Sequence, residues 1–180
     1  AMYHVRARRF VRLADDSIPS VNVSDNGRVA VANSRERYSI EAMWGDAGTD
    51  VYLIDATSGS IRRLAEKITG SAQLSTGGKY VIYFHDGAYY SHSIANGRTV
   101  NITTPLTGVS FADETHDTPS PASDYDIAGW THDDRSVLVY DRYDIWELDP
   151  TGERRPVMVT DSTGRRTKVI LRLAMGSGRF

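Results

Sequence analysis

The sequence contains no cysteine among its 180 residues. This absence excludes disulfide bonds, thiolate metal ligands and a cysteine nucleophile at once. The sequence also has no run of eighteen apolar residues, so we expect no membrane-spanning segment. No charged segment followed by an apolar one opens the chain, and we therefore expect no signal peptide within this sequence.

The sequence has no strong excess of charge of either sign. Its 21 Lys and Arg residues stand against 23 Asp and Glu residues, which gives a formal net charge of -2. Nucleic-acid binding requires a basic face, and acidic membrane surfaces attract basic segments. The charge balance therefore predicts neither a nucleic-acid partner nor a membrane partner.

Helical periodicity is scarce, and the apolar residues come in short bursts instead. Each burst is rich in β-branched or aromatic residues and is bounded by turn residues, which is typical of β-strands. The clear bursts lie at residues 29–31, 51–54, 80–84, 137–140 and 157–159. Only residues 35–43 favour a helix, and their periodicity is poor. The pattern predicts an all-β fold.

A module of strand, polar turn, strand, strand, glycine turn and strand recurs three times along the chain. Its polar turns lie at residues 24–28, 75–79 and 131–135. Four antiparallel strands in this order form one blade of a β-propeller. The predicted units are an outer strand of a preceding blade (1–19), blade one (20–70), blade two (71–106), an inter-blade loop (107–124), blade three (125–162), and the start of a next blade with a tail (163–180).

About three blades cannot close a ring, since closed propellers use about four to eight. We therefore expect a partial, unclosed propeller. Residues 5–13 are expected to form a strand without a blade of its own, and residues 168–173 the opening strand of a further unit. Open blade faces would expose apolar surface, which predicts association into a dimer or an exchange of strands.

Two segments resemble the propeller of prolyl oligopeptidase-like and dipeptidyl peptidase-like serine peptidases. The segment Leu74-Ser75-Thr76-Gly77-Gly78-Lys79-Tyr80 is similar to the repeat Leu-Ser-Pro-Asp-Gly-Lys-Tyr of that family, with Thr76 in place of Pro and Gly77 in place of Asp. The stretch DIAGWTHDDRSVLVYDRYDIWELDPTG, residues 126–152, looks like a blade from a bacterial branch of the family. The resemblance covers roughly residues 20–160.

The resemblance implies a larger parent protein, periplasmic or secreted, in which the propeller covers a C-terminal α/β-hydrolase domain. That domain carries a serine nucleophile in the motif G-x-S-x-G, followed by Asp and His. None of these elements is recognisable here, so we predict no catalytic residue, no metal and no cofactor in this chain. The implied role is to gate or filter peptide substrates for the hydrolase domain.

Two polar groups are candidate substrate or rim contacts. Glu114, His116 and Asp117 lie with Asp113 in the long inter-blade loop, where they could contact a ligand or a cation. The alternative is a solvated loop whose acids accept hydrogen bonds from nearby backbone amides. Arg142 could face the substrate, or it could pair with Asp141 or Asp144 inside a tight strand connection. Trp44, Trp130 and Trp146 are predicted to lie in the core.

Two other functions compete with the accessory propeller of a peptidase. A binding or scaffold propeller with no enzyme attached would have the same fold. A glycan-processing propeller would carry turns of the form Ser-x-Asp-x-Gly-x-Thr-Trp. The turns that begin at Ser24 and Ser75 both lack Asp two residues after Ser, which disfavours this third class.

Overall fold

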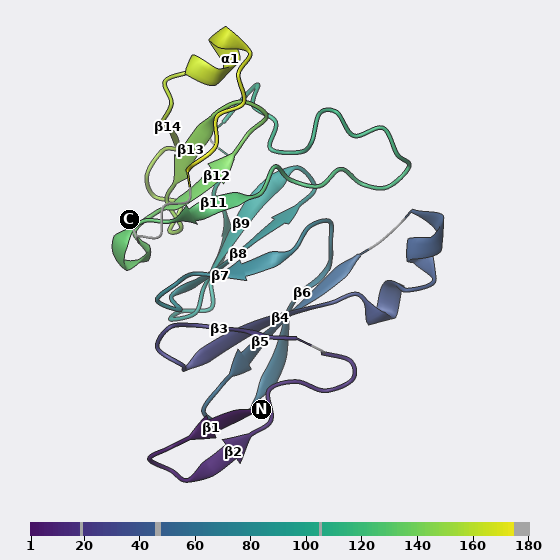
Figure 1. The fold of residues 1–180 in the computed structure, drawn as a ribbon, viewed down its shortest axis with the longest axis vertical. Coiled ribbons are helices and arrows are strands. Elements are labelled where there is room, and N and C mark those ends of the chain that lie inside the picture. Colours follow the sequence, from purple (N-terminus) through teal and green to yellow (C-terminus); the bar gives the residue numbers. More distant parts are fainter. Residues whose placement is uncertain (19, 46–47, 105, 175–180) are drawn as a thin grey trace.

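The computed structural model describes residues 1–18, 20–45, 48–104 and 106–174, and within them strands dominate (Figure 1). Strands form one two-stranded hairpin and three four-stranded antiparallel sheets, and none of these described sheets closes on itself. The hairpin is β1 (Met2–His4) and β2 (Arg9–Val11). Blade one is β3 (Asn22–Val23), β4 (Val29–Ser34), β5 (Thr49–Asp55) and β6 (Ile61–Ile68); blade two is β7 (Ala72–Leu74), β8 (Tyr80–His85), β9 (Ala88–Ser93) and β10 (Thr99–Asn101); blade three is β11 (Ile127–Trp130), β12 (Val137–Tyr140), β13 (Ile145–Leu148) and β14 (Val157–Met158).

The helical elements are short and lie outside the sheets. They are the 3-10 helices η1 (Glu36–Tyr38), η2 (Glu41–Trp44) and η3 (His132–Asp134), and the helix α1 (Thr163–Thr167). No helix in the described part of the chain is long and apolar enough to cross a membrane.

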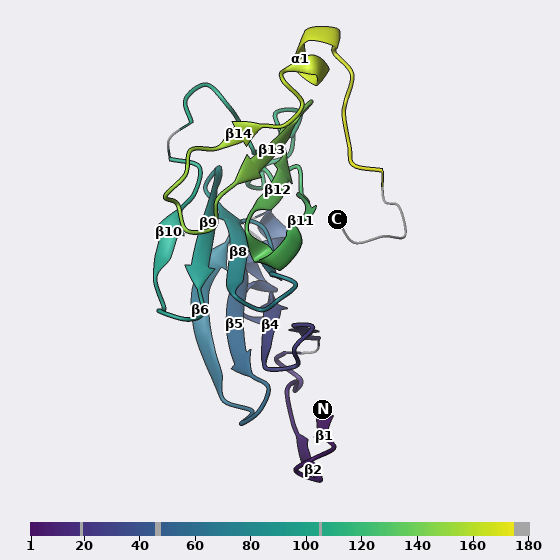
Figure 2. The ribbon, with the colours of Figure 1, turned by 90° about the vertical axis from the view of Figure 1, so that its left-hand side faces the viewer.

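The strands of each blade follow one another in chain order, so each blade has two distinct ends. The turns between first and second strands and between third and fourth strands share one end, which we call the turn end. The turns between second and third strands share the opposite end with the connections from blade to blade. We call this opposite end the rim end, and both long excursions of the chain belong to it (Figures 1 and 2).

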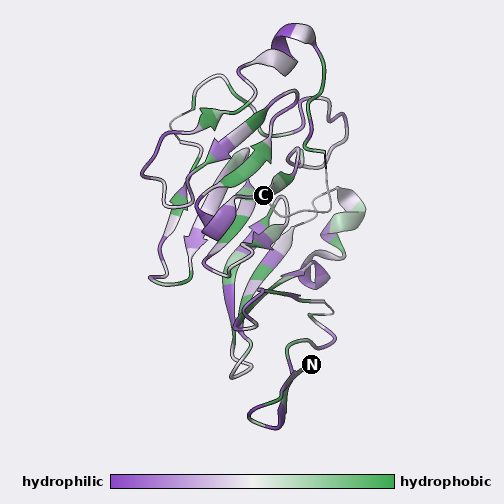
Figure 3. Ribbon diagram, turned by 60° about the vertical axis from the view of Figure 1, so that its left-hand side comes forward, coloured by the Kyte–Doolittle hydropathy of each residue, from purple (hydrophilic) through white to green (hydrophobic). Residues whose placement is uncertain are grey.

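The alternation of side chains along the strands explains why the blades stack face to face. In blade one, Val31 and Leu53 lie in an apolar cluster with Val81 and Tyr83 of blade two. Their chain neighbours in blade one face the other way, into a cluster beneath the hairpin. Because side chains alternate between the two faces of a strand, each blade needs cover on both sides. Figure 3 shows hydrophobic segments along the central strands and hydrophilic segments at many turns.

The core between blades two and three contains a chain of aromatic rings. Tyr89 packs edge-on against Phe84 at 5.2 Å and against Phe111 at 5.6 Å, measured between ring centroids. Phe111 in turn packs edge-on against Trp146 at 6.1 Å. Edge-to-face pairs at such distances are favourable beyond the area they bury. Trp146 is buried as predicted, and Trp130 packs half-buried at the edge of the same cluster.

The polar turns of successive blades are hydrogen-bonded to one another at the turn end. Asp134 of blade three is buried, and its carboxylate accepts hydrogen bonds from the Ser75 hydroxyl at 2.7 Å and the Gly77 amide at 3.0 Å. The Asn26 side chain of blade one donates to the Gly77 carbonyl at 2.7 Å. The turn at residues 75–79 is therefore held from both sides, and we call this set of contacts the inter-blade staple.

The inter-blade staple also explains why glycine occupies position 77, where the family repeat has aspartate. A Cβ atom on Gly77 would lie 2.8 Å from the nearer carboxylate oxygen of Asp134. A side chain at this position would displace the carboxylate that holds the turn. Gly78 follows with a φ of +72°, a conformation that glycine adopts without strain.

The two chain ends differ from the predicted strands. Residues 5–13 were expected to form one strand, but the chain reverses within them and β1 pairs with β2, with Tyr3 opposite Phe10. Residues 168–173 form no strand; they follow α1, and the Leu171 amide donates to the Tyr143 carbonyl at 2.8 Å. The expected tail reaches residues 175–180, which lie outside the described residues.

Replacing Asp134 should weaken the inter-blade staple. We expect Asp134→Asn to lower the free energy of unfolding by about 1–3 kcal/mol, because one oxygen acceptor becomes a donor beside the Ser75 hydroxyl and the Gly77 amide. Asp133→Asn is the matched control, since Asp133 has a similar positive φ but an exposed side chain. Urea unfolding measures both variants, and equal midpoints would contradict the staple.

Candidate functional site

The rim end brings together segments that are far apart in the sequence. The described residues 35–45 and 48 belong to an insertion between β4 and β5, and residues 102–104 and 106–126 belong to the connection from blade two to blade three. Both project to the same side of the stack, at the right of Figure 1. They meet at Gly45, where a Cβ atom added to the glycine would lie 3.5 Å from the Ser120 amide nitrogen and 3.7 Å from Pro119. We take this combined surface as the candidate site and call it the rim.

A buried carboxylate anchors the insertion. Asp50 of β5 accepts hydrogen bonds from the Tyr38 hydroxyl at 2.6 Å, the Arg37 guanidinium at 2.9 Å and the Lys67 amide at 3.1 Å. Burial alone would raise the pKa of Asp50, but these hydrogen bonds outweigh it and hold that pKa below its usual value. Burial and the bond to Asp50 raise the pKa of Tyr38 to about 12.

The outer part of the insertion exposes apolar side chains. Ile40, Met43 and Trp44 are 72 %, 82 % and 83 % exposed. The prediction that Trp44 lies in the core is therefore wrong. Its segment is η2, a single turn without any buried residue that projects beyond the sheet. Sequence composition alone does not separate this tryptophan from the two that belong to strands.

The inter-blade loop is folded by local hydrogen bonds. Asp113 accepts from the Thr115 amide at 2.9 Å, and the Tyr125 hydroxyl accepts from the Glu114 amide at 2.8 Å. The Nε2 atom of His116 lies 2.7 Å from the Ser120 carbonyl oxygen and 2.9 Å from the Thr118 hydroxyl. A carbonyl oxygen only accepts, so Nε2 carries the proton and donates it.

This arrangement of His116 bears on catalysis. The Ser120 hydroxyl lies 3.1 Å from the same Nε2 atom, which already donates to the Ser120 carbonyl. A base must offer an unprotonated nitrogen to the hydroxyl that it activates. Ser120 is therefore not an activated nucleophile in this geometry. Across the described residues, no group of three or more His, Asp or Glu side chains could hold a metal ion.

The root of the loop is tied to blade two. The Tyr89 hydroxyl donates to Asp124 at 2.7 Å, and the two side chains lie against the aromatic core. Burial raises the pKa of Asp124, and burial together with the charge of Asp124 raises the pKa of Tyr89 well above its usual value. The end of the loop is therefore held to blade two, while its tip reaches the insertion.

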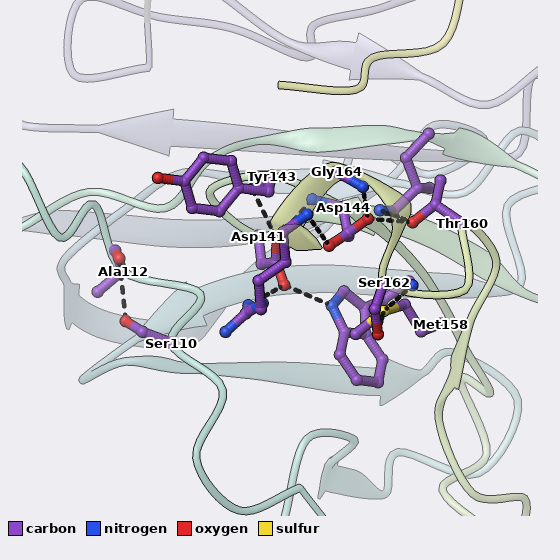
Figure 4. Close-up of polar contacts among 12 residues, drawn as sticks. Ser110, Ala112, Asp141, Tyr143, Asp144, Met158, Thr160, Ser162 and Gly164 are labelled. Carbon is purple, nitrogen blue, oxygen red and sulfur yellow. Dashed lines mark hydrogen bonds and ion pairs between the residues drawn. The ribbon is translucent and has the colours of Figure 1, made fainter. Parts of the chain in front are cut away.

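Two further buried carboxylates hold the rim turn of blade three (Figure 4). Asp141 accepts from the Tyr143 and Asp144 amides, from the Trp146 indole at 2.9 Å and from the Arg165 guanidinium at 2.7 Å. Asp144 accepts from the Thr160 hydroxyl at 2.7 Å and from the Gly164 amide at 2.9 Å. These bonds fix α1 against the turn.

Arg142 differs from its predicted structural role. Its expected partners, Asp141 and Asp144, are taken by Arg165 and by backbone amides. Among the described residues Arg142 makes no ion pair, and its guanidinium lies over the Tyr143 ring at 5.2 Å from the centroid. Arg165, on α1, takes the place of Arg142 as the partner of Asp141. The local spacing of residues in the sequence does not indicate a contact between positions so far apart.

The four predicted contact residues all lie at the rim end. Glu114, His116 and Asp117 share the inter-blade loop, and Arg142 occupies the rim turn of blade three. No described interaction joins Arg142 to the other three. Their role in binding stays a prediction. Sequence reasoning missed the anchors Asp50 and Arg165, because each acts across more than ten residues of chain.

Comparisons with known proteins identify the fold. No family model matches the chain, and no curated protein matches it. Among solved structures, TolB from Acinetobacter baumannii is similar over 82 % of this chain and 33 % of its own, with 15 % identity and a TM-score of 0.50.

Two other solved structures are similar at a TM-score of 0.48. A putative TolB from Agrobacterium tumefaciens has 15 % identity over 83 % of this chain and 50 % of its own. The β-propeller domain of the Trilobed protease from Pyrococcus furiosus has 10 % identity over 78 % of this chain and 42 % of its own. This chain thus spans between a third and a half of the length of these structures. The predicted fold, a partial β-propeller of three four-stranded blades, is confirmed.

The anchor of the insertion should give a pH-dependent contribution to stability. The folded pKa of Asp50 lies below its unfolded value of about 3.9, so its contribution is complete above that value and is lost as the pH falls through the folded pKa. We expect Asp50→Asn to cost about 3 kcal/mol of unfolding free energy at neutral pH.

The same substitution should cost less in acid, because the stabilising charge of the wild-type carboxylate is lost as the pH falls through its folded pKa. Denaturant unfolding of both proteins at neutral pH and at about pH 2 measures the difference. Asp86→Asn is the control, since its side chain is 74 % exposed. A cost for Asp50→Asn that stays constant across this range would contradict the assignment.

Proposed function

We propose that this chain is a non-catalytic propeller segment of a larger serine peptidase of the prolyl oligopeptidase family, and that its rim contacts peptide substrates. The propeller fold and the resemblance of residues 74–80 and 126–152 to that family support the proposal. In this proposal the partner is a C-terminal α/β-hydrolase domain of the parent chain, and the propeller gates or filters the peptides that reach it.

One observation carries the binding role of the rim. Exposed apolar side chains sit on an insertion that is anchored through Asp50 and contacts the inter-blade loop. Apolar surface held on a firm support, with polar groups close by, is the composition expected of a peptide-binding surface. The Glu114 and Asp117 carboxylates and the Arg142 guanidinium add charges of both signs at the same end.

The alternative is a binding propeller with no enzyme attached. Both proposals accommodate the arrangement of His116 and Ser120, because neither of them places catalysis in this chain. The coding sequence of the parent protein separates the two proposals. A G-x-S-x-G motif after the propeller, followed by Asp and His, supports the peptidase. A complete parent sequence without this motif would contradict the peptidase proposal and support the binding propeller.

Peptide binding at the rim can be measured directly. We expect a labelled library of random octapeptides to yield ligands whose affinity falls about tenfold in Trp44→Ser, because a large exposed ring is lost from the contact surface. Ile61→Ser is the matched control, since Ile61 is also an exposed apolar residue but lies at the turn end. Fluorescence anisotropy gives both affinities. Equal losses in the two variants, or no ligand, would argue against the rim.

We also propose that two copies of this chain associate through the outer face of the hairpin. Tyr3 and Phe10 pair across the strands with ring centroids 4.7 Å apart, and with Val5 they are 48–76 % exposed. Light scattering should therefore show a dimer whose population rises with concentration, and Phe10→Ser should shift it to monomer. Trp44→Ser should leave it unchanged. A monomeric wild type at every concentration would refute this association.

A further inference from the structure

A second concave surface lies at the turn end, away from the rim. It is a cleft of about 410 Å³ between the turns of blade one and the end of β9 in blade two. Leu53 and Ile94 supply apolar surface, and Ser60 supplies a hydroxyl. Arg28 and Arg62 line the same cleft, from the first turn of blade one and from β6. The volume lies in the range of small-molecule sites.

The charge pairing of these two arginines differs from that of several other arginines in the described part of the chain. Arg37, Arg63 and Arg165 each pair with a carboxylate. Within the described residues, neither Arg28 nor Arg62 makes an ion pair, although both lie in a chain with more acids than bases. Two guanidinium groups without counterions that line one cleft attract an anion, because they provide charge and paired N–H donors together.

Arg62 is oriented by the neighbouring blade. Its guanidinium lies 3.1 Å from Nε2 of His92, a buried residue of β9. An arginine only donates, so Nε2 accepts and the ring is neutral, with Nδ1 donating to the Thr99 hydroxyl at 2.9 Å. Burial and the charge of Arg62 lower the pKa of His92, which keeps the ring in this form. The neutral His92 ring therefore holds one edge of the Arg62 guanidinium across the blade interface and does not neutralise its positive charge.

One acidic residue, Asp55, also lines the cleft, and its carboxylate is hydrogen-bonded to the turn that follows it in the chain. Asp55 accepts hydrogen bonds from the Thr57 amide at 2.7 Å and the Ser58 amide at 3.1 Å through a single oxygen. These amide hydrogen bonds lower the pKa of Asp55, so it remains charged. Two arginines and one aspartate leave the lining with an excess of one positive charge.

We propose that this cleft binds a small organic anion, with a carboxylate or phosphate head between Arg28 and Arg62 and an apolar body against Leu53 and Ile94. The excess positive charge favours an anionic head group, and the apolar surface of Leu53 and Ile94 favours an organic anion over an inorganic ion. The proposal is independent of the rim, since the two surfaces lie at opposite ends of the blades.

Isothermal titration calorimetry with three matched probes tests the chemistry. Phenyl phosphate and benzoate share the ring and differ in the head group, and benzyl alcohol has the ring without a charge. We expect at least one anion to bind and benzyl alcohol to bind at least about tenfold more weakly. Inorganic phosphate should also bind more weakly than phenyl phosphate. Equal binding of the alcohol, or no binding of either anion, would overturn the proposal.

Substitutions locate the site. Arg62→Gln and Arg28→Gln should each weaken binding of the better anion about tenfold, because each removes a charged donor from the head. Arg98→Gln is the control, since Arg98 occupies the corresponding turn of blade two outside this cleft. Urea unfolding confirms that each variant is folded.

In the wild type the anion should shift the amide resonances of Thr57 and Ser60. Unchanged affinity in both cleft variants would place the anion elsewhere and refute the assignment.

Discussion

A four-stranded sheet has two faces, and the architecture of this protein follows from the need to cover both of them. Alternate residues of β4, β5 and β8 enter different apolar clusters, so blades one and two each take part in two interfaces, whereas the described core residues of blade three enter one cluster. Such sheets stack side by side, and each added sheet presents a new face in turn. The stacking fixes the direction of the strands, and thereby decides which connections meet at which end. The position of every candidate site residue depends on this constraint.

The two ends of the blades use the chain in different ways. At the turn end the connections are short, and Asp134, Gly77 and Asn26 hydrogen-bond successive blades directly to one another. Close approach of backbone and carboxylate leaves no room for a side chain at Gly77. At the rim end two connections are long, namely the insertion and the inter-blade loop, and Asn33 of blade one also hydrogen-bonds the backbone of Ala72 in blade two directly. Variation in length is tolerated at the rim because the staple holds the blades at the opposite end.

The sequence predicts the parts of this structure that depend on local chemistry. Short β-branched bursts such as residues 80–84 became strands, and the polar turns recur where the repeat predicted them. The errors have three different causes. Residues 5–13 carry apolar residues suited to a strand, yet the chain reverses within them and pairs with residues 2–4. Arg142 has two acids within two residues, yet Asp141 is paired with Arg165, which lies on α1. Trp44 looked like a core residue because composition does not reveal that its turn projects beyond the sheet.

Buried carboxylates at the rim explain how long connections can still present a defined surface. A buried charge is costly unless hydrogen bonds satisfy it, so a loop that supplies the donors is bound to the position of the acid. Asp50 fixes the insertion in this way through Tyr38 and Arg37, and Asp144 fixes α1 through the Gly164 amide. The exposed side chain of Trp44 is carried by the insertion that these bonds attach to β5. Conformational entropy that the rim segments lose on folding is not lost again when a ligand binds. Recognition by such a rim therefore has a lower entropic cost than recognition by a mobile loop.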